Sequence, residues 1–261
     1  MAPRRPRAAS TAEVAFTYPA FAPGTLALEE VDLSQRVEDE TYEAEVVRLQ
    51  ERAYALQIRN YLDGKQTVLV FEGWDASGKG GAIKRLTAFM DPRGYRVWPI
   101  SAPRDEERRN HWLWRFWTRL PEHGELVVFD RSWYGRVLVE RVERLARAEA
   151  WRRAYDEINA FERTLTAEGV RLLKFFLHID RETQLERFRK REKDPIRRYK
   201  LGDEDWRNRK RWSAYAAATQ EMLDRTHRPD APWVIIPAND KKHARLAVLR
   251  AAIRLLEGKL P

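Results

Sequence analysis

The stretch GWDASGKGG, residues 73–81, constrains this chain most, because it has the G-x-x-x-x-G-K spacing of a phosphate-binding (Walker A) loop. An apolar run, QTVLVFE, precedes it and an amphipathic segment follows it, which is the strand–loop–helix context that such a loop requires. Its glycines let backbone N–H groups face an anion, and Lys79 adds a positive charge. A glycine-rich turn that binds nothing is the alternative. The residues expected to contact phosphate here are Gly73, Ala76, Ser77, Gly78, Gly80, Gly81 and Lys84.

One position departs from the pattern, because Gly80 stands where a Ser or Thr hydroxyl normally holds Mg²⁺. Asp75, inside the loop, is the substitute ligand we expect, since a carboxylate beside bare phosphate is costly unless a cation lies between them. Asp130 ends the apolar run ELVVFD, where phosphate-loop enzymes place their second Mg²⁺ ligand. An N-cap role for Asp130 is the alternative. The sequence thus predicts a Mg²⁺ site at Asp75 and Asp130, with Mn²⁺ as an alternative ion.

The rest of the chain alternates short apolar runs with amphipathic segments, which indicates an α/β fold with a parallel sheet covered on both faces. Strands are expected at residues 66–72, 95–100, 125–130, 170–179 and 233–237. Helices are expected at residues 38–62, 81–90, 105–120, 133–146, 150–167, 203–224 and 241–256. Residues 1–33 contain four prolines and little periodicity, which predicts an extended N-terminal arm. Residues 34–261 are expected to form one domain.

The net charge of +9 favours an anionic partner, and more than half of this charge lies in one segment of twenty residues. Residues 181–200 contain nine basic and four acidic side chains, a net +5, and Pro195 breaks the helix within this segment. Such a segment can close over a transferring phosphoryl group and exclude water, as the lid of a nucleotide kinase does. A solvated, charged helix end is the alternative. The candidate lid residues are Arg189, Arg191, Arg197 and Arg198.

Two further groups of residues allow either a functional or a structural reading. Arg131 and Arg136 follow Asp130 closely and can reach anionic oxygens, although as isolated residues they are ordinary surface arginines. The tryptophans of residues 112–117, with Trp206 and Trp212, are able to stack on bases, but core packing is favoured because the segments also need apolar faces.

The composition argues against disulfides, cysteine or zinc sites and a membrane-spanning segment. The chain has no cysteine, so disulfides and cysteine-based metal sites are excluded and a reducing compartment, the cytoplasm, is expected. Its five histidines lack zinc-site spacing. The apolar runs are too short to span a bilayer, and no apolar segment follows the basic start as in a secretory signal.

Five motifs resemble the polyphosphate kinase family 2, over the chain from about Leu56 to the C-terminus. They are GWDASGKGG, FDRSWYGRVLVERV, REKDPIRRYKL, DEDWRNRKRW and APWVIIPANDKKHAR. The resemblance implies a P-loop kinase-like three-layer sandwich with a central parallel sheet of about five strands, a helical lid and an N-terminal extension. It also implies Mg²⁺ dependence, inorganic polyphosphate as phosphoryl donor, and a homo-oligomer (dimer or tetramer).

The residue roles that the resemblance implies fall on the motifs. Asp75 and Asp130 are the metal-organising and catalytic carboxylates, Lys79 and the loop amides hold phosphate, and the arginines 131 and 136 contact the nucleotide's phosphates. The WYGRVLVERV form is most similar to the branch of polyphosphate:AMP phosphotransferases, since the diphosphate-preferring branch more often has Asn at Gly135.

The expected function is therefore transfer of the terminal phosphate of polyphosphate to a purine nucleotide, AMP to ADP. Phosphorylation of ADP or GDP by polyphosphate, an ATP-dependent nucleoside or nucleotide kinase, and a non-enzymatic nucleic-acid-binding protein are the alternatives. An acceptor phosphate oxygen is already ionised, so the reaction needs charge neutralisation and alignment rather than a histidine base.

Overall fold

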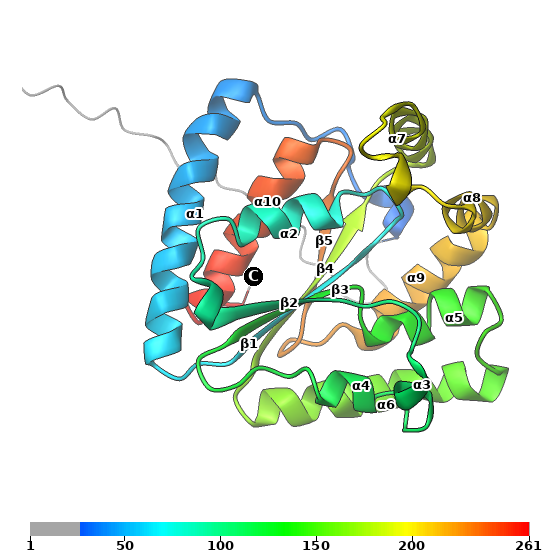
Figure 1. Cartoon of the computed structure of the whole chain (residues 1–261), viewed down its shortest axis with the longest axis horizontal. Coiled ribbons are helices and arrows are strands. Elements are labelled where there is room, and N and C mark those ends of the chain that lie inside the picture. Colours follow the sequence, from blue (N-terminus) through cyan, green and yellow to red (C-terminus); the bar gives the residue numbers. More distant parts are fainter. Residues whose placement is uncertain (1–26, 261) are drawn as a thin grey trace, which may run out of the picture.

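The computed structural model describes residues 27–260, and a five-stranded, all-parallel sheet forms its centre (Figure 1). The strands are β1 (Thr67–Gly73), β2 (Tyr95–Pro99), β3 (Leu126–Asp130), β4 (Arg171–His178) and β5 (Trp233–Pro237), in the order β2-β3-β1-β4-β5. The strand that carries the phosphate loop is thus central. All five predicted strands are confirmed to within a residue or two at their ends.

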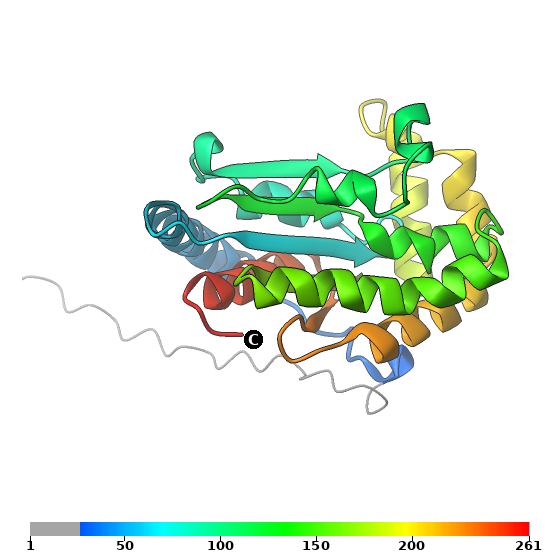
Figure 2. The same cartoon turned by 90° about the horizontal axis from the view of Figure 1, so that it is seen from below.

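Helices cover both faces of the sheet, as the apolar strands predicted. One face is covered by α1 (Asp39–Leu62), α2 (Lys79–Leu86) and α10 (Lys241–Leu256). On the other, α6 (Ala148–Ala167) packs against β4 and against α9 (Trp212–Thr226), as Figures 1 and 2 show. The remaining elements are η1 (Leu28–Glu30), η2 (Pro92–Gly94), α3 (Asp105–Arg108), α4 (Trp114–Trp117), η3 (Trp133–Arg136), α5 (Val139–Val142), α7 (Arg181–Lys193), η4 (Arg198–Lys200) and α8 (Asp203–Lys210). The three-layer α/β prediction is confirmed.

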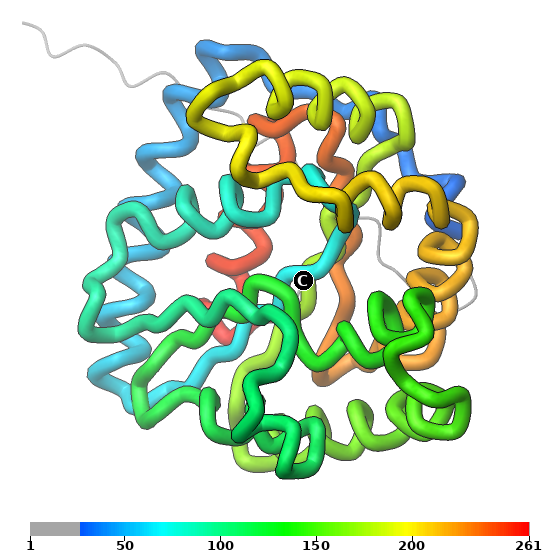
Figure 3. Tube along the Cα trace, turned by 45° about the vertical axis from the view of Figure 1, so that its right-hand side comes forward, coloured from blue at the N-terminus to red at the C-terminus, as the bar shows by residue number. Residues whose placement is uncertain are grey.

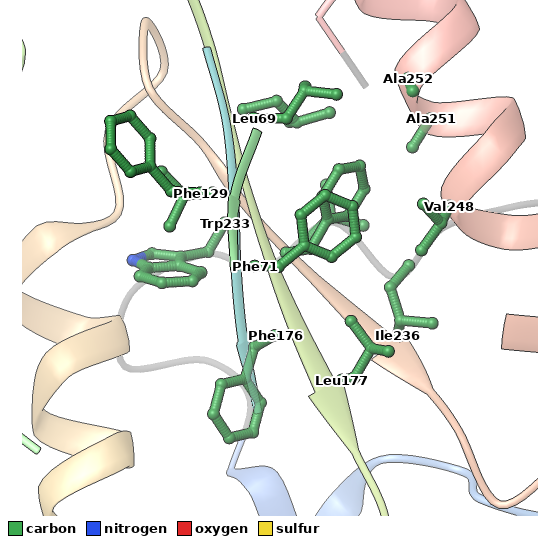
Figure 4. Packing of buried hydrophobic residues seen from close by; sticks show 14 of the residues in the cluster. Leu69, Phe71, Phe129, Phe176, Leu177, Trp233, Ile236, Val248, Ala251 and Ala252 are labelled. Carbon is green, nitrogen blue, oxygen red and sulfur yellow. The ribbon is translucent and has the colours of Figure 1, made fainter. Parts of the chain in front are cut away.

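The core lies on both sides of the central strands (Figure 4). Leu177 and Ile236 point toward Val248 of α10, whereas Phe129 and Trp233 point to the opposite side. Because alternate residues of a strand face opposite sides, a strand covered on both faces must be apolar at every position. This explains the uninterrupted VLVF run of β1, whose four residues are fully buried.

Two of the predicted helices were wrong, because local side-chain bonds and burial interrupt them. In the segment 105–120, the amide of Asn110 bonds the carbonyl of Glu106 and His111 accepts from the N–H of Leu113, leaving only α3 and α4. In the segment 133–146, Ser132 accepts from the N–H of Tyr134, and the chain forms η3 and then α5. Turning tightly here lets η3 bury both of its aromatic side chains completely.

Two other helices differ in extent. The helix expected at 203–224 is two helices, α8 and α9, separated at Arg211, whose φ and ψ are −100° and 24°. The helix after the phosphate loop ends at Leu86 rather than residue 90. The basic helix α7 ends at Lys193, before Pro195, as predicted.

The predicted arm falls mostly on residues outside the described range. Its last residues, 27–33, are described and are not extended throughout: η1 forms there, and Leu28 and Val31 are buried in the core. No helix between residues 27 and 260 is both long and apolar enough to cross a membrane.

Candidate functional site

The loop between β1 and α2 requires glycine at two turns. Gly73 and Gly78 have φ values of 142° and 109°, and Ala76 between them also has a left-handed backbone, with φ of 61°. A Cβ atom on Gly73 would lie 2.4 Å from the carbonyl oxygen of Leu177, so no other residue fits against β4. Helix α2 begins at Lys79, directly after Gly78. Its free N–H groups therefore face the loop, as in a phosphate site.

Lys79 is held inside this loop. Its Nζ donates to the carbonyl oxygens of Gly73 (2.6 Å) and Trp74 (3.1 Å). Burial lowers the pKa of Lys79, and the neighbouring charge of Arg131 lowers it further, while nearby carboxylates raise it. The ammonium group is thus partly desolvated and surrounded by acids, and an arriving phosphate would add a strong partner.

Asp75 meets residues from two distant segments. Its Oδ1 accepts from Arg131 (3.1 Å), and its Oδ2 accepts from the side-chain amide of Asn208 on α8 (2.9 Å). Arg131 itself has a left-handed backbone, with φ of 65°, at the end of β3. A non-glycine residue in this strained conformation is typical of functional sites.

Asp130 lies beside the loop, at the end of β3, the strand next to β1. It pairs with Phe71 of β1 in the parallel register, and a Cβ on Gly80 would lie 4.0 Å from its Oδ2. The position of the missing hydroxyl is therefore beside this carboxylate. The N-cap of the following element is Ser132, so the capping alternative for Asp130 is wrong.

These donors fit a hard divalent cation. Both Asp75 and Asp130 act electrostatically on Lys79, so they share one region, and all their ligating atoms are oxygens. Within residues 27–260, no group of three or more acidic or histidine side chains could hold a metal alone. Such a site suits Mg²⁺, which usually takes one or two carboxylates and completes its shell with water and substrate phosphates.

Glu72 is a further carboxylate that the sequence reasoning missed. It is buried at the end of β1 and accepts from the hydroxyl of Ser132 (2.7 Å). Burial raises the pKa of Glu72, against the lowering effects of Ser132, Lys79 and Arg131. An acid within an otherwise apolar strand was the available signal.

A basic cavity of about 440 Å³ lies beside the loop, between α2, α7 and α10. Nine of its lining side chains are Lys or Arg and one, Asp194, is acidic. The basic residues are Lys84, Arg85, Arg187, Lys190, Arg191, Arg197, Lys200, Lys241 and Arg245. Ala76, Ser77, Gly78, Gly80 and Gly81 of the loop form its floor, and the buried Ser77 hydroxyl makes no hydrogen bond to the described residues.

The four predicted lid residues have different surroundings in the structure. Arg191 and Arg197 line the basic cavity, whereas Arg189 lies in a different surface hollow with Glu182 and Glu186. Arg198 is in η4 and is not among the residues that line either the cavity or the hollow. The segment thus presents only part of its charge to the loop.

Arg187, which the sequence reasoning did not single out, holds the loop in place. Its guanidinium donates to the carbonyl oxygens of Ala76 and Ser77 (both 2.9 Å) and to those of Ala238 and Asn239 (2.7 and 2.9 Å). Burial lowers its pKa to about 10. This arginine therefore fastens α7 to the phosphate loop and to the end of β5, a role that its position in a charged run did not reveal.

Arg136 lines neither the basic cavity beside the loop nor the pocket on the loop's other side. It pairs with Glu140 (3.0 Å) and packs over the Trp112 ring at 4.9 Å. Among the predicted aromatic residues, Trp112 and Trp212 both pack against the core, as favoured, and Trp212 also lines a pocket at the site.

A second, smaller pocket, of about 80 Å³, lies on the other side of the loop residues 72–75 and is largely apolar. Its wall includes Trp74, Leu138, Phe176, Trp212 and Tyr215. Asp75, Arg131 and Asn208 border it with polar groups, and Gly135 lines it without a side chain. The loop thus separates a cationic cavity from an aromatic pocket.

Comparison with known proteins agrees with this geometry. The family model described as "Polyphosphate kinase 2 (PPK2)" matches residues 36–260. The polyphosphate:AMP phosphotransferase of Pseudomonas syringae pv. tomato is 50% identical over 88% of this chain and 46% of its own length. The ADP-polyphosphate phosphotransferase of Pseudomonas aeruginosa is 41% identical over 84% of this chain and 72% of its own length.

Two crystal structures share the fold. The putative polyphosphate kinase 2 of Pseudomonas aeruginosa has a TM-score of 0.86 and 47% identity, covering 88% of this chain and 50% of that chain. The polyphosphate kinase 2 of Arthrobacter aurescens has a TM-score of 0.87 and 32% identity, covering 91% and 87%. The chain spans about half the length of the polyphosphate:AMP phosphotransferases that it matches. With its phosphate loop, its paired carboxylates and a family match over nearly its whole described length, the chain belongs to the polyphosphate kinase 2 family.

Proposed function

We propose that this chain is a Mg²⁺-dependent phosphotransferase that moves the terminal phosphate of inorganic polyphosphate to AMP, giving ADP. The observation that carries the proposal is the basic cavity beside the phosphate loop, which is lined by nine cationic side chains and only one acidic side chain. A long polyanion can contact many of these charges at once, whereas the base and ribose of ATP cannot.

The cationic side chains of the cavity repel one another. The pKa of Lys241 is lowered to about 8, first by burial and then by Arg187, Arg245 and other cations. Bound polyphosphate would relieve this repulsion, and each close phosphate contact adds to a salt-sensitive affinity.

The residues of the site divide the reaction between them. Lys79 and the loop amides hold the transferring phosphoryl group. Arg131, which bonds Asp75 from the end of β3, neutralises charge on the acceptor phosphate. Asp75 and Asp130 would hold Mg²⁺, which supplies charge neutralisation and alignment when bound. The acceptor oxygen is ionised at neutral pH, so no side chain has to remove a proton.

AMP is the proposed acceptor because of the relatives. Three curated relatives named polyphosphate:AMP phosphotransferase are 46–50% identical to this chain, and the relatives named for ADP, GDP or NDP are 39–45% identical. Mn²⁺ as an alternative ion and a homo-oligomeric state belong to the same proposal.

A product panel tests the function. The protein is incubated with Mg²⁺, polyphosphate and, separately, AMP, ADP, GMP or GDP, and nucleotides are separated by chromatography. We expect ADP from AMP as the fastest reaction. Faster formation of ATP or GTP would contradict the assignment of AMP as acceptor. Activity with ATP that polyphosphate cannot replace would contradict polyphosphate as the donor. Nucleic-acid binding without any phosphate transfer would contradict an enzymatic function.

A further inference from the structure

The aromatic pocket beside the loop is built around two stacked tryptophans. Trp74, between Gly73 and Asp75 in the loop, stacks on Trp212 of α9 with ring centroids 3.8 Å apart and planes 7° from parallel. Both line the pocket, and so does Phe176, which meets Trp74 edge-on. A largely apolar pocket with a few polar groups at its border suits a planar, partly polar ligand.

The Trp74 side of this wall is held by a histidine behind it. The indole N–H of Trp74 donates to Nδ1 of His178 (2.8 Å), which is buried at the end of β4. Accepting through Nδ1 requires that the ring is neutral with its proton on Nε2. The orientation of Trp74 therefore depends on what holds His178.

The N-terminal segment Leu28–Val31 supplies that support. The Leu28 backbone is hydrogen-bonded to His178, and the N–H of Leu28 donates to the side chain of Gln220 on α9 (2.9 Å). The side chains of Leu28 and Val31 are 4% and 8% exposed, so the segment is anchored in the core. Figure 2 shows η1, in blue, beside α9. One short segment thus contacts both the histidine that bonds Trp74 and the helix that carries Trp212.

We propose that the segment Leu28–Val31 is a positioning element for the nucleotide acceptor, because it holds the Trp74–Trp212 wall against which the acceptor's base packs. The inference rests on the proposed function and deepens it by assigning the base to the aromatic pocket and the polyanion to the basic cavity. Packing of a base on aromatic side chains is strong enough to contribute to acceptor affinity.

Calorimetric titration of the full chain with AMP and with ribose 5-phosphate tests the proposal, because the two share the phosphate and ribose and differ by the base. Leu28→Ala should weaken AMP binding about tenfold, since the wall must then be ordered on binding. The same variant should bind ribose 5-phosphate and polyphosphate as the unchanged protein does. Leu49→Ala, at a buried site on α1, is the matched control for lost core volume and should leave AMP affinity unchanged.

A second variant keeps the test decisive if Leu28→Ala does not fold. His178→Phe preserves a buried ring but removes both hydrogen bonds, and it should weaken AMP in the same base-dependent way. Equal loss of AMP and ribose 5-phosphate affinity, or no loss of either, would overturn the inference. Unchanged protein that binds AMP no better than ribose 5-phosphate would also overturn it. If AMP bound more tightly than ribose 5-phosphate but no phosphate were transferred from polyphosphate, the proposed function would be contradicted and the inference about the pocket would stand.

Discussion

Lys79 and Asp130 show how single residues combine with the backbone at this site. Lys79 is half-buried, and its Nζ donates to carbonyl oxygens of its own loop, so its charge is held at the loop. Asp130 reaches the same place from β3, next to Gly80. The two residues thus bring opposite charges to one end of the sheet from two different elements.

Lys79→Ala and Asp130→Asn should each lower kcat by a hundredfold or more, because removing one well-placed charge costs about 3 kcal/mol of barrier. Steady-state rates with polyphosphate and AMP measure this, and chemical unfolding should show folded proteins. Near-normal turnover of Asp130→Asn would contradict the metal-site assignment.

His178 predicts a pH dependence of stability. Burial lowers its pKa to about 4, against the raising effects of the Leu28 backbone and of Asp180, so the folded protein resists protonation that the unfolded chain accepts near its ordinary pKa of 6.5. The free energy of unfolding should be highest above pH 6.5 and fall as the pH drops toward 4, by about 3 kcal/mol from this group.

Urea unfolding of the unchanged protein and of His178→Phe at pH 7 and pH 5 measures the difference. The unchanged protein should lose about 2 kcal/mol more than the variant over this interval. Parallel losses in the two proteins would show that His178 is not kept neutral by burial.

At the scale of elements, α7 has two functionally different faces. One carries Arg187, which bonds the phosphate loop, and Arg191, which lines the basic cavity. The other carries Arg189 beside Glu182 and Glu186. Successive residues of a helix point about 100° apart. Arginines that are close in the sequence of α7 therefore lie on different faces of the helix and contact different residues.

The double variant Arg191→Ala/Arg197→Ala should raise the KM for polyphosphate and flatten its dependence on salt, because two phosphate contacts are lost. The measurement is the KM for polyphosphate at increasing KCl concentration. Arg189→Ala, from the same helix, is the control and should change neither quantity. An equal effect of Arg189→Ala would contradict the assignment of the two faces.

The short elements near the site show where periodicity fails as a guide. The residues of η3 and α5 carry an amphipathic pattern that predicts one helix, yet Ser132 caps a tight turn that buries Trp133 and Tyr134. The gain from burying two aromatic rings exceeds the gain from continuing a marginal helix. Such a choice depends on partners far away in the sequence.

At the scale of the whole molecule, a buried ion pair joins the sheet to the helical layer that contains α6. Nζ of Lys174 in β4 donates to Glu162 in α6 (2.7 Å), and both side chains are completely buried. Glu162 also accepts from Trp133 (3.0 Å) and Tyr134 (2.6 Å) of η3. The segment that follows Asp130 is thereby anchored between two layers.

Lys174→Met should destabilise the fold by about 3–5 kcal/mol, because it leaves the carboxylate of Glu162 buried without its counter-charge. Adding Glu162→Gln should recover part of the loss, since the amide oxygen can still accept from η3. Chemical unfolding measures both variants. Arg153→Met, at the exposed pair with Glu157, is the control and should change stability by no more than about 0.5 kcal/mol; an equal loss there would contradict the prediction.

The sequence by itself determined the α/β fold, the phosphate loop and the positions of Asp75, Lys79 and Asp130, because these depend on local patterns: apolar strands, glycine spacing and strand ends. Tertiary structure alone decided which arginines face the loop, that Arg187 fastens it, and that Glu72 and Asn208 join the site. It also brought Leu28 to the wall around Trp74 and Trp212. These contacts join segments far apart in the chain, and no local pattern records which face of a helix or loop another segment will cover.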